Sequence, residues 1–188
     1  MPPKIMITRQ QVLDAAFELV RREGLAALSA RRVARQLGCS TQPVYRAYRS
    51  MEQLRVEVLR RAEAVARSYL AGDRTDERPF LQIGLGSLRF AQQEPQLFRL
   101  APPHVRDLQQ GKMPPDFLLD RMRTDPVLAP MSDEQLARIN TLMWFFSQGL
   151  ATLFASSEMD GDPMRLAVEY LMLAGRAVVE LETRRNES

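Results

Sequence analysis

The side chains with the clearest chemical potential lie between residues 40 and 49, in the segment STQPVYRAYR. They carry hydroxyl, amide, phenol and guanidinium groups, which bond to the phosphates and base edges of nucleic acids. Gln42 can pair bidentately with adenine, and Pro43 offers an apolar surface to a thymine methyl group. Arg46 and Arg49 suit bidentate contacts with phosphate or guanine. The segment therefore predicts a surface that binds double-stranded DNA.

Two short helices joined by a tight turn are predicted to carry these side chains. Apolar or small residues recur at helical spacing on both sides of Gly38, from Val33 to Ala47. Gly38 lies where the first helix must stop, because a residue without a Cβ atom adopts the left-handed conformation easily. Ser29 and Ser40 are the expected N-caps of the two helices. This pattern is typical of a DNA-binding helix-turn-helix, whose second helix enters the major groove.

Several other candidate contacts also have a simpler structural explanation. Arg31, in the first turn of the first helix, is placed to reach a base or a phosphate. Thr8, Ser29 and Ser40 can contact phosphate, but their expected capping roles already explain them. Tyr48 is either a phosphate donor or a half-buried aromatic of the core. The complete set of predicted DNA contacts is Thr8, Ser29, Arg31, Ser40, Thr41, Gln42, Pro43, Tyr45, Arg46, Tyr48 and Arg49.

Charge is distributed unevenly along the 188 residues. Residues 1–60 have eleven Lys or Arg and five Asp or Glu, whereas the remainder has fifteen and eighteen. A basic first third is expected to bind a polyanion, and a mildly acidic remainder is not. The single cysteine cannot form an internal disulfide, and we interpret Cys39 as a core residue. We expect no signal peptide and therefore a cytoplasmic protein.

The whole chain reads as helical, with no strand candidate. Capping-box patterns, in which Ser or Thr precedes Gln by three residues, begin helices at Thr8, Ser50 and Ser132. Further helices are predicted over residues 79–93, 95–101, 116–124 and 162–182. We therefore predict an all-α fold of about nine helices. Residues 1–50 form the DNA-binding domain, a linking helix follows, and residues 51–188 complete a helical bundle.

The bundle is predicted to bury its most apolar helix and to enclose a cavity. In the uncharged run 139–157, eight of nineteen residues are polar or glycine, which favours an interface helix over a membrane span. Ten methionines, Gly84 and Gly86 within a helix, and the loop at 102–115 suit a deformable apolar pocket. The predicted pocket residues are Leu85, Leu88, Phe98, His104, Phe117, Met122, Met143, Trp144 and Ser147.

The first sixty residues resemble the TetR family of bacterial one-component repressors. The matching segments include Glu23-Gly24-Leu25, Arg32 to Ser40 and Val44 to Leu54. Weaker similarity continues through Glu94 to Phe98 and at Trp144 with Gln148-Gly149-Leu150. Two positions depart from the family, which often has histidine in place of Ala47 and lysine in place of Met51, both on the DNA backbone. Arg46, Arg49 and Tyr48 are the candidates to replace those two contacts.

The resemblance implies a homodimer that binds an operator and responds to a small molecule. We expect a repressor released from a palindromic operator when a mostly apolar effector binds the C-terminal domain. Its two last long helices are expected to form a four-helix interface with those of a second subunit. The predicted interface residues are Phe145, Gly149, Thr152, Leu171, Ala174, Gly175 and Val178.

Two other classes of function remain as alternatives. An enzyme on a helical bundle would need converging acids, bases or metal ligands, but the chain has one histidine and one cysteine. We therefore expect no catalysis, no metal and no cofactor, and we interpret His104 as a surface or pocket-rim residue. A helical adaptor would keep the N-terminal fold for protein contacts, and it would dimerise without binding DNA.

Overall fold

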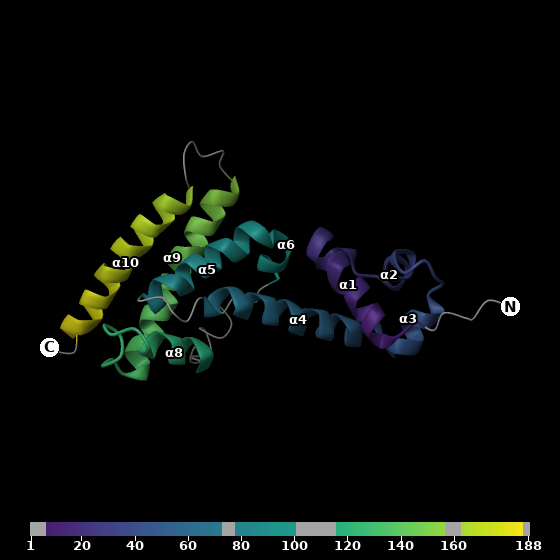
Figure 1. Cartoon of the computed structure of the whole chain (residues 1–188), viewed down its shortest axis with the longest axis horizontal. Helices are drawn as coiled ribbons and strands as arrows, with labels where there is room; N and C mark the ends of the chain where they lie inside the picture. The colour runs from purple at the N-terminus through teal and green to yellow at the C-terminus, as the bar shows by residue number, and fades with distance from the viewer. Residues whose placement is uncertain (1–6, 73–77, 101–115, 157–162, 186–188) are drawn as a thin grey trace. The chain divides into compact units, whose positions relative to one another are not determined.

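A computed structural model describes residues 7–72, 78–100, 116–156 and 163–185, and within these ranges the chain is all-α. This confirms the predicted fold class (Figure 1). The described residues form one short 3-10 helix, η1, at Leu25–Ala27. Their α-helices are α1 (Arg9–Glu23), α2 (Ala30–Gln36), α3 (Gln42–Ala47), α4 (Met51–Ala71), α5 (Pro79–Gln93), α6 (Pro95–Phe98), α8 (Asp116–Arg123), α9 (Asp133–Ser156) and α10 (Pro163–Arg185).

The chain divides into two compact units, which do not follow a single cut along the sequence. The first unit contains Met1–Ala66 together with Glu94–Ala101, and the second contains Arg67–Gln93 and Pro102–Ser188. The boundary between Ala66 and Arg67 falls inside α4, so that helix belongs to both units. The short helix α6 belongs to the first unit, although it follows α5 of the second. The predicted domains, residues 1–50 and 51–188, stay a prediction about function, because these units are defined by packing alone.

In the first unit, α1, α2 and α3 pack around an apolar core to which α4 and α6 contribute. Val12, Val33, Val44 and Leu54 are each at most 1% exposed, and they come from four different helices. The apolar face of α1 recurs every three or four residues, which lets one side of the helix cover the others. Local interactions set the ends of α1. Its cap Thr8 forms a complete capping box with Gln11, as the sequence predicts.

In the second unit, α5, α9 and α10 pack against one another, and α8 contacts α5 and α9 (Figure 1). The Ser132 capping box is complete, because the Ser132 N–H donates to Gln135 at 3.0 Å and the Gln135 N–H donates to Ser132 Oγ at 3.3 Å. Buried Asp125 accepts a hydrogen bond from the Phe80 N–H at the start of α5 (3.4 Å). These contacts hold two helix ends in place within the unit.

Two helix glycines allow close packing in the second unit, as the sequence suggests. A Cβ atom added at Gly86 would lie 2.1 Å from the carbonyl oxygen of Tyr69, so only glycine lets α5 approach the end of α4 this closely. At Gly84 an added Cβ would lie 3.1 Å from Leu171 Cδ2 on α10. Gly86 therefore faces a backbone, whereas Gly84 faces the tip of a side chain.

Some predicted helix ends are wrong by a few residues. Thr41 rather than Ser40 is the N-cap of α3, and its side chain makes no capping hydrogen bond. At α4 the Gln53 N–H donates to Ser50 Oγ (3.2 Å), but Gln53 Oε1 accepts from Arg49 rather than from Ser50, so the box is only half formed. The helix beginning at Pro95 ends at Phe98. The residue predicted to begin the last helix, 162, lies outside the described residues.

Candidate nucleic-acid interface

The helix-turn-helix is built as its sequence predicts. Gly38 has a φ angle of +63° and lies two residues after the end of α2. The Cys39 N–H donates to the Ala34 carbonyl at 3.0 Å, which closes the turn. Val44 is 1% exposed and holds α3 against the core. Pro43 lies in the first turn of α3, where its missing N–H costs no helical hydrogen bond.

The other side of α3 is exposed and carries the polar side chains predicted to contact DNA. Gln42, Arg46 and Arg49 are exposed, and Tyr45 is 54% exposed. Thr41 is half-buried next to Gln42. Because α3 buries only Val44 among its own residues, most of its surface is free to enter a groove. The structure thus brings the predicted base-reading and phosphate-binding groups onto one short helix and the residues that flank it.

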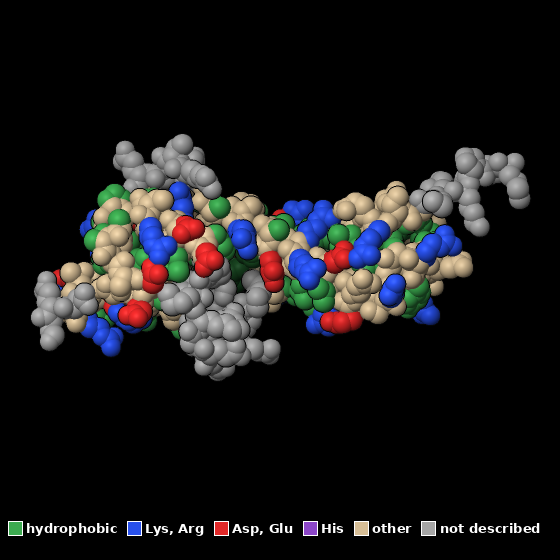
Figure 2. All heavy atoms as spheres, turned by 90° about the horizontal axis from the view of Figure 1, so that it is seen from below, with side chains coloured by type: hydrophobic (Ala, Val, Ile, Leu, Met, Phe, Trp, Pro, Cys, Tyr) green, Lys and Arg blue, Asp and Glu red, His purple; other side chains and the backbone are tan. Residues whose placement is uncertain are grey.

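Arginine side chains of the first unit divide into those held in ion pairs and those without one. Arg31, Arg35, Arg46 and Arg49 are exposed and have no carboxylate partner among the described residues. The guanidinium groups of Arg9, Arg21, Arg32 and Arg61 pair with Glu57, Glu94, Glu23 and Asp14, respectively. The first group can therefore bind phosphate without first breaking an ion pair. Figure 2 shows Lys and Arg side chains over the surface of the first unit, on the right.

Arg35 was not among the predicted contacts. It lies in the last turn of α2, where its charge also interacts favourably with the helix dipole. The only signal in the sequence was the net positive charge of the region, which does not single out one arginine. Its exposure and lack of an ion pair distinguish it from Arg32, three residues earlier in the same helix.

Tyr48 does not fit the prediction of a phosphate contact. Its side chain is buried, with 1% of the residue exposed, and its hydroxyl donates to Glu57 Oε2 at 2.8 Å. Burial, followed by this hydrogen bond to a carboxylate, raises the pKa of Tyr48 to about 12. The alternative, an aromatic of the core, describes this residue correctly. The prediction failed because its polar hydroxyl finds a partner inside the protein, nine residues along the chain.

The predicted capping serine and threonine residues take different roles. Ser29 accepts a hydrogen bond from the Arg32 N–H at 3.4 Å and caps α2. Thr8 accepts from the Gln11 N–H at 3.2 Å. Ser40 is exposed and caps nothing, so its hydroxyl remains available for phosphate. Ala47 and Met51, the two departures from the resembled family, are both half-buried and carry no charge.

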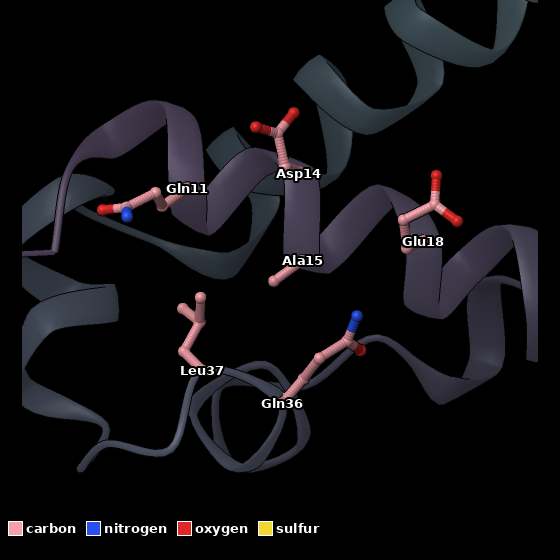
Figure 3. A pocket seen from close by; sticks show the side chains of 6 residues that line it. All are labelled: Gln11, Asp14, Ala15, Glu18, Gln36 and Leu37. Carbon is pink, nitrogen blue, oxygen red and sulfur yellow. The ribbon is translucent and has the colours of Figure 1, made fainter.

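A hollow of about 330 Å³ lies on the first unit between α1 and α2 (Figure 3). Gln11, Asp14, Ala15 and Glu18 line it from α1, and Gln36 and Leu37 line it from the end of α2. Asp14 also pairs with Arg61, and this hydrogen bond lowers the pKa of the Asp14 carboxyl. Two carboxylates at this hollow oppose phosphate binding, so it is not part of the candidate DNA surface.

The predicted ligand-pocket residues are mostly buried, but they are not all in one unit. Leu85, Leu88, Met122, Met143 and Ser147 are between 0% and 9% exposed within the second unit. Half-buried Phe117 and Trp144 lie on α8 and α9 of the same unit, and the Phe117 ring stacks under the Arg67 guanidinium at 4.6 Å. Phe98 belongs to the first unit, and His104 lies outside the described residues.

The predicted intersubunit residues divide between two sides of their helices. Phe145 is 52% exposed, and Gly149 and Thr152 are also exposed on α9. Leu171 is 3% exposed and packs against Gly84, and buried Gly175 faces Phe80 and Met143 of the same chain. Those two residues are therefore used inside the protomer, because their side of α10 packs against α5 and α9. Ala174 and Val178 are half-buried.

Two residues that the sequence did not single out as site residues hold α6 in the first unit. Glu94 is 4% exposed, and both its carboxylate oxygens accept hydrogen bonds from the Arg21 guanidinium of α1. The Arg21 Nε–H donates to Glu94 Oε2 at 2.7 Å. A bidentate pair of this kind is geometrically specific. Glu94 opens the segment Glu94 to Phe98 that carried part of the family resemblance, so its contact with α1 gives that segment a structural role.

Neither a metal centre nor a membrane span is found in the described part of the chain. In residues 7–72, 78–100, 116–156 and 163–185, no three His, Cys, Asp or Glu side chains are grouped so that they could hold a metal ion. None of the helices in these ranges has the length and apolar character needed to cross a bilayer.

Comparison with known proteins agrees with the helix-turn-helix. Residues 12–58 match the family model for bacterial regulatory proteins, tetR family. No curated protein matches the chain. Among solved structures, the fold is similar to that of the putative transcriptional regulator SCO4942 from Streptomyces coelicolor, with a TM-score of 0.53 and 24% identity. That similarity covers 93% of this chain and 98% of the other. The helix-turn-helix region of this chain is therefore similar to that of bacterial regulatory proteins of the tetR family.

Proposed function

We propose that this regulator is a homodimeric repressor that leaves a palindromic operator when a small, mostly apolar molecule binds its second unit. The observation that carries the DNA-binding part is the exposed surface of α3 with two arginines that have no ion pair, Arg46 on α3 and Arg49 two residues after its end. Unpaired guanidinium groups supply the sequence-independent attraction to phosphate, whereas Gln42 supplies a base-reading group. The proposed contacts with DNA lie on or next to α3, which is only six residues long.

A mobility-shift assay with DNA from upstream of the protein's own gene tests this function. We expect preferred binding to one duplex over random DNA of equal length, and weaker binding as salt rises. Equal binding to both duplexes, without salt dependence, would exclude a sequence-specific repressor. It would favour the adaptor alternative, which dimerises without DNA.

Two buried serine residues in the second unit support a ligand site there. Ser147 on α9 is 4% exposed and Ser87 on α5 is 9% exposed, and α5 and α9 contact each other. A serine hydroxyl both donates and accepts hydrogen bonds, so these two residues are the proposed polar contacts of the ligand. Most buried residues of these two helices are apolar, which sets the character of the proposed effector.

A thermal-shift screen of apolar metabolites tests the ligand site. A ligand that binds only the folded protein raises the unfolding temperature by mass action. We expect the same compound to weaken operator binding, since a ligand shifts an equilibrium only by its differential affinity for two states. A compound that stabilises the protein without changing DNA binding would argue against an effector role.

Exposed apolar side chains on α9 and α10 support the homodimer. On α9, Leu142 is 44%, Phe145 52% and Leu153 50% exposed, and on α10, Leu173 is 64% and Leu181 61% exposed. Leu142 and Phe145 are three residues apart, and Leu153 follows Phe145 by eight residues, as Leu181 follows Leu173, so each set follows one helix face. Apolar faces of this kind are unusual on monomers and are common at subunit interfaces. This face replaces the buried Leu171 and Gly175 in the proposed interface.

Light scattering coupled to size-exclusion chromatography tests the homodimer. We expect a dimer for the natural chain and a monomer for Phe145→Arg or Leu173→Arg. Val127→Arg is the matched control, because Val127 is 61% exposed but lies outside both helices. If all three variants have the same mass as the natural chain, the proposed interface is wrong.

The protein would act in the cytoplasm, where its DNA is, and we propose no catalytic activity.

A further inference from the structure

Three helices of the first unit meet at one carboxylate group, that of Glu57 on α4. The Tyr48 hydroxyl donates to Glu57 Oε2 at 2.8 Å, and the Arg9 guanidinium forms an ion pair with Glu57 Oε1. Arg9 is the first residue of α1, and Tyr48 directly follows the last residue of α3. The carboxylate therefore joins the start of α1 and the end of α3 to the second turn of α4.

Arg9 makes two further contacts with the end of α3. Its Nη1 donates to the Ala47 carbonyl oxygen at 3.4 Å, which is one of the carbonyls left free at the end of the helix. Its guanidinium lies over the Tyr48 ring, with the central carbon 4.3 Å from the ring centroid. The Tyr48 N–H in turn donates to the Val44 carbonyl at 2.9 Å and closes the last turn of α3.

Burial makes these contacts obligatory for Tyr48. Because only 1% of the residue is exposed, its hydroxyl cannot exchange Glu57 for water. The hydrogen bond from Tyr48, and then that from Arg9, lower the pKa of the Glu57 carboxyl, which keeps it charged at neutral pH. A shift of α4 that moves Glu57 would therefore leave a buried hydroxyl without an acceptor.

We infer that Glu57 is a positioning residue for DNA binding, which through Tyr48 and Arg9 fixes the recognition helix α3 on α4. This inference rests on the proposed DNA-binding function. Glu57 contacts no DNA in this scheme, and Arg9, neutralised by Glu57, supplies little charge to phosphate. The positions of Gln42 and Arg46 depend on Glu57, because both residues lie on α3. This helix buries only Val44 among its own residues.

The direction in which Glu57→Gln changes the affinity for DNA distinguishes a positioning role of Glu57 from a purely electrostatic one. Glu57→Gln removes a negative charge from the DNA-binding unit, so electrostatics alone predicts tighter binding to DNA. Positioning predicts weaker binding, because an amide is a poorer acceptor for Tyr48 and a poor partner for Arg9. Glu52→Gln is the matched control: Glu52 is an exposed residue of the same helix and has no ion-pair partner among the described residues.

The experiment measures binding of the full chain to a duplex that the natural chain selects from a random-sequence library, by fluorescence anisotropy at several KCl concentrations. We expect Glu57→Gln to bind about fivefold or more weakly, the loss of a charge-assisted hydrogen bond, with the salt slope unchanged. Glu52→Gln should bind equally or more tightly. Tyr48→Phe should weaken binding on its own and add little to Glu57→Gln, since the two residues share one interaction. If the Glu57→Gln variant binds DNA as tightly as the Glu52→Gln variant, the inference is wrong.

Hydrogen exchange in the free protein tests the link between α4 and α3 even if the protein binds no DNA. We expect faster exchange of the amides at the end of α3 in Glu57→Gln than in Glu52→Gln, with exchange in the middle of α1 unchanged. If the natural chain binds no DNA, the proposed function fails. In that case faster exchange confined to α3 still supports the link between α4 and α3, and unchanged exchange overturns it.

Discussion

Replacement of Gly86 by alanine should destabilise the second unit, because the added methyl group meets a backbone. Its Cβ would lie 2.1 Å from the Tyr69 carbonyl oxygen, 2.9 Å from the Tyr69 carbonyl carbon and 3.3 Å from Leu70 Cα. A side chain could rotate away, but a helix backbone cannot. The end of α4 and the middle of α5 must therefore separate by about an ångström, which opens the packing around them.

The expected magnitude is the difference between two opposing effects. Overpacking against rigid structure costs about 2–3 kcal/mol. Alanine in place of glycine within a helix contributes about 1 kcal/mol of stability in return. The net loss is about 1–2 kcal/mol, which lowers the unfolding temperature of a chain of this size by roughly 2–8 °C.

The other helix glycines supply the controls. At Gly84 the added Cβ meets only the tip of Leu171, at 3.1 Å and 3.2 Å, so Gly84→Ala should stay within about 1 kcal/mol of the natural chain. At Gly149 nothing lies within 4 Å, so Gly149→Ala should raise the unfolding temperature. Circular dichroism at 222 nm, at one fixed protein concentration, measures all three. If the Gly86→Ala variant unfolds at the same temperature as the Gly84→Ala variant, the reasoning from backbone contact is wrong.

The remaining predictions concern the first unit. Arg21→Ala should destabilise it in urea more than Glu94→Gln, because the first leaves a buried carboxylate unpaired and the second leaves a half-exposed guanidinium that water can solvate. Stability should fall as pH rises from about 10 to about 12, since the folded protein holds the Tyr48 proton more tightly than the unfolded chain, and Tyr48→Phe should flatten this fall in urea titrations. Gln42→Ala should relax sequence preference among selected duplexes, whereas Arg49→Ala should weaken binding to all of them and reduce the salt slope by about one.

The features predicted correctly from the sequence are local ones. Thr8 and Gln11 form their capping box, Gly38 takes the left-handed conformation, and Pro43 lies in the first turn of a helix. Each depends on residues at most four apart, so the pattern of residue types is sufficient. The length of α5 was predicted correctly for the same reason, because Pro79 fixes its start and Pro95 begins the next helix.

Three features depend on contacts between distant residues, which the sequence does not display. The Tyr48 hydroxyl finds its acceptor on Glu57. The segment that begins at Glu94 is held in the first unit by Arg21, 73 residues earlier. Leu171, a predicted intersubunit residue, fills the space beside Gly84.

Residue types and their spacing are therefore sufficient to predict the helices, the turn of the helix-turn-helix and the polar residues on its second helix. Helix periodicity and caps act over a few residues, and a run of side chains displays them directly. Packing in three dimensions sets which arginines have no ion pair, which tyrosine is buried and which helix faces are exposed. Those outcomes depend on where a carboxylate such as Glu57 or Glu94 arrives in space, and packing between helices sets that position.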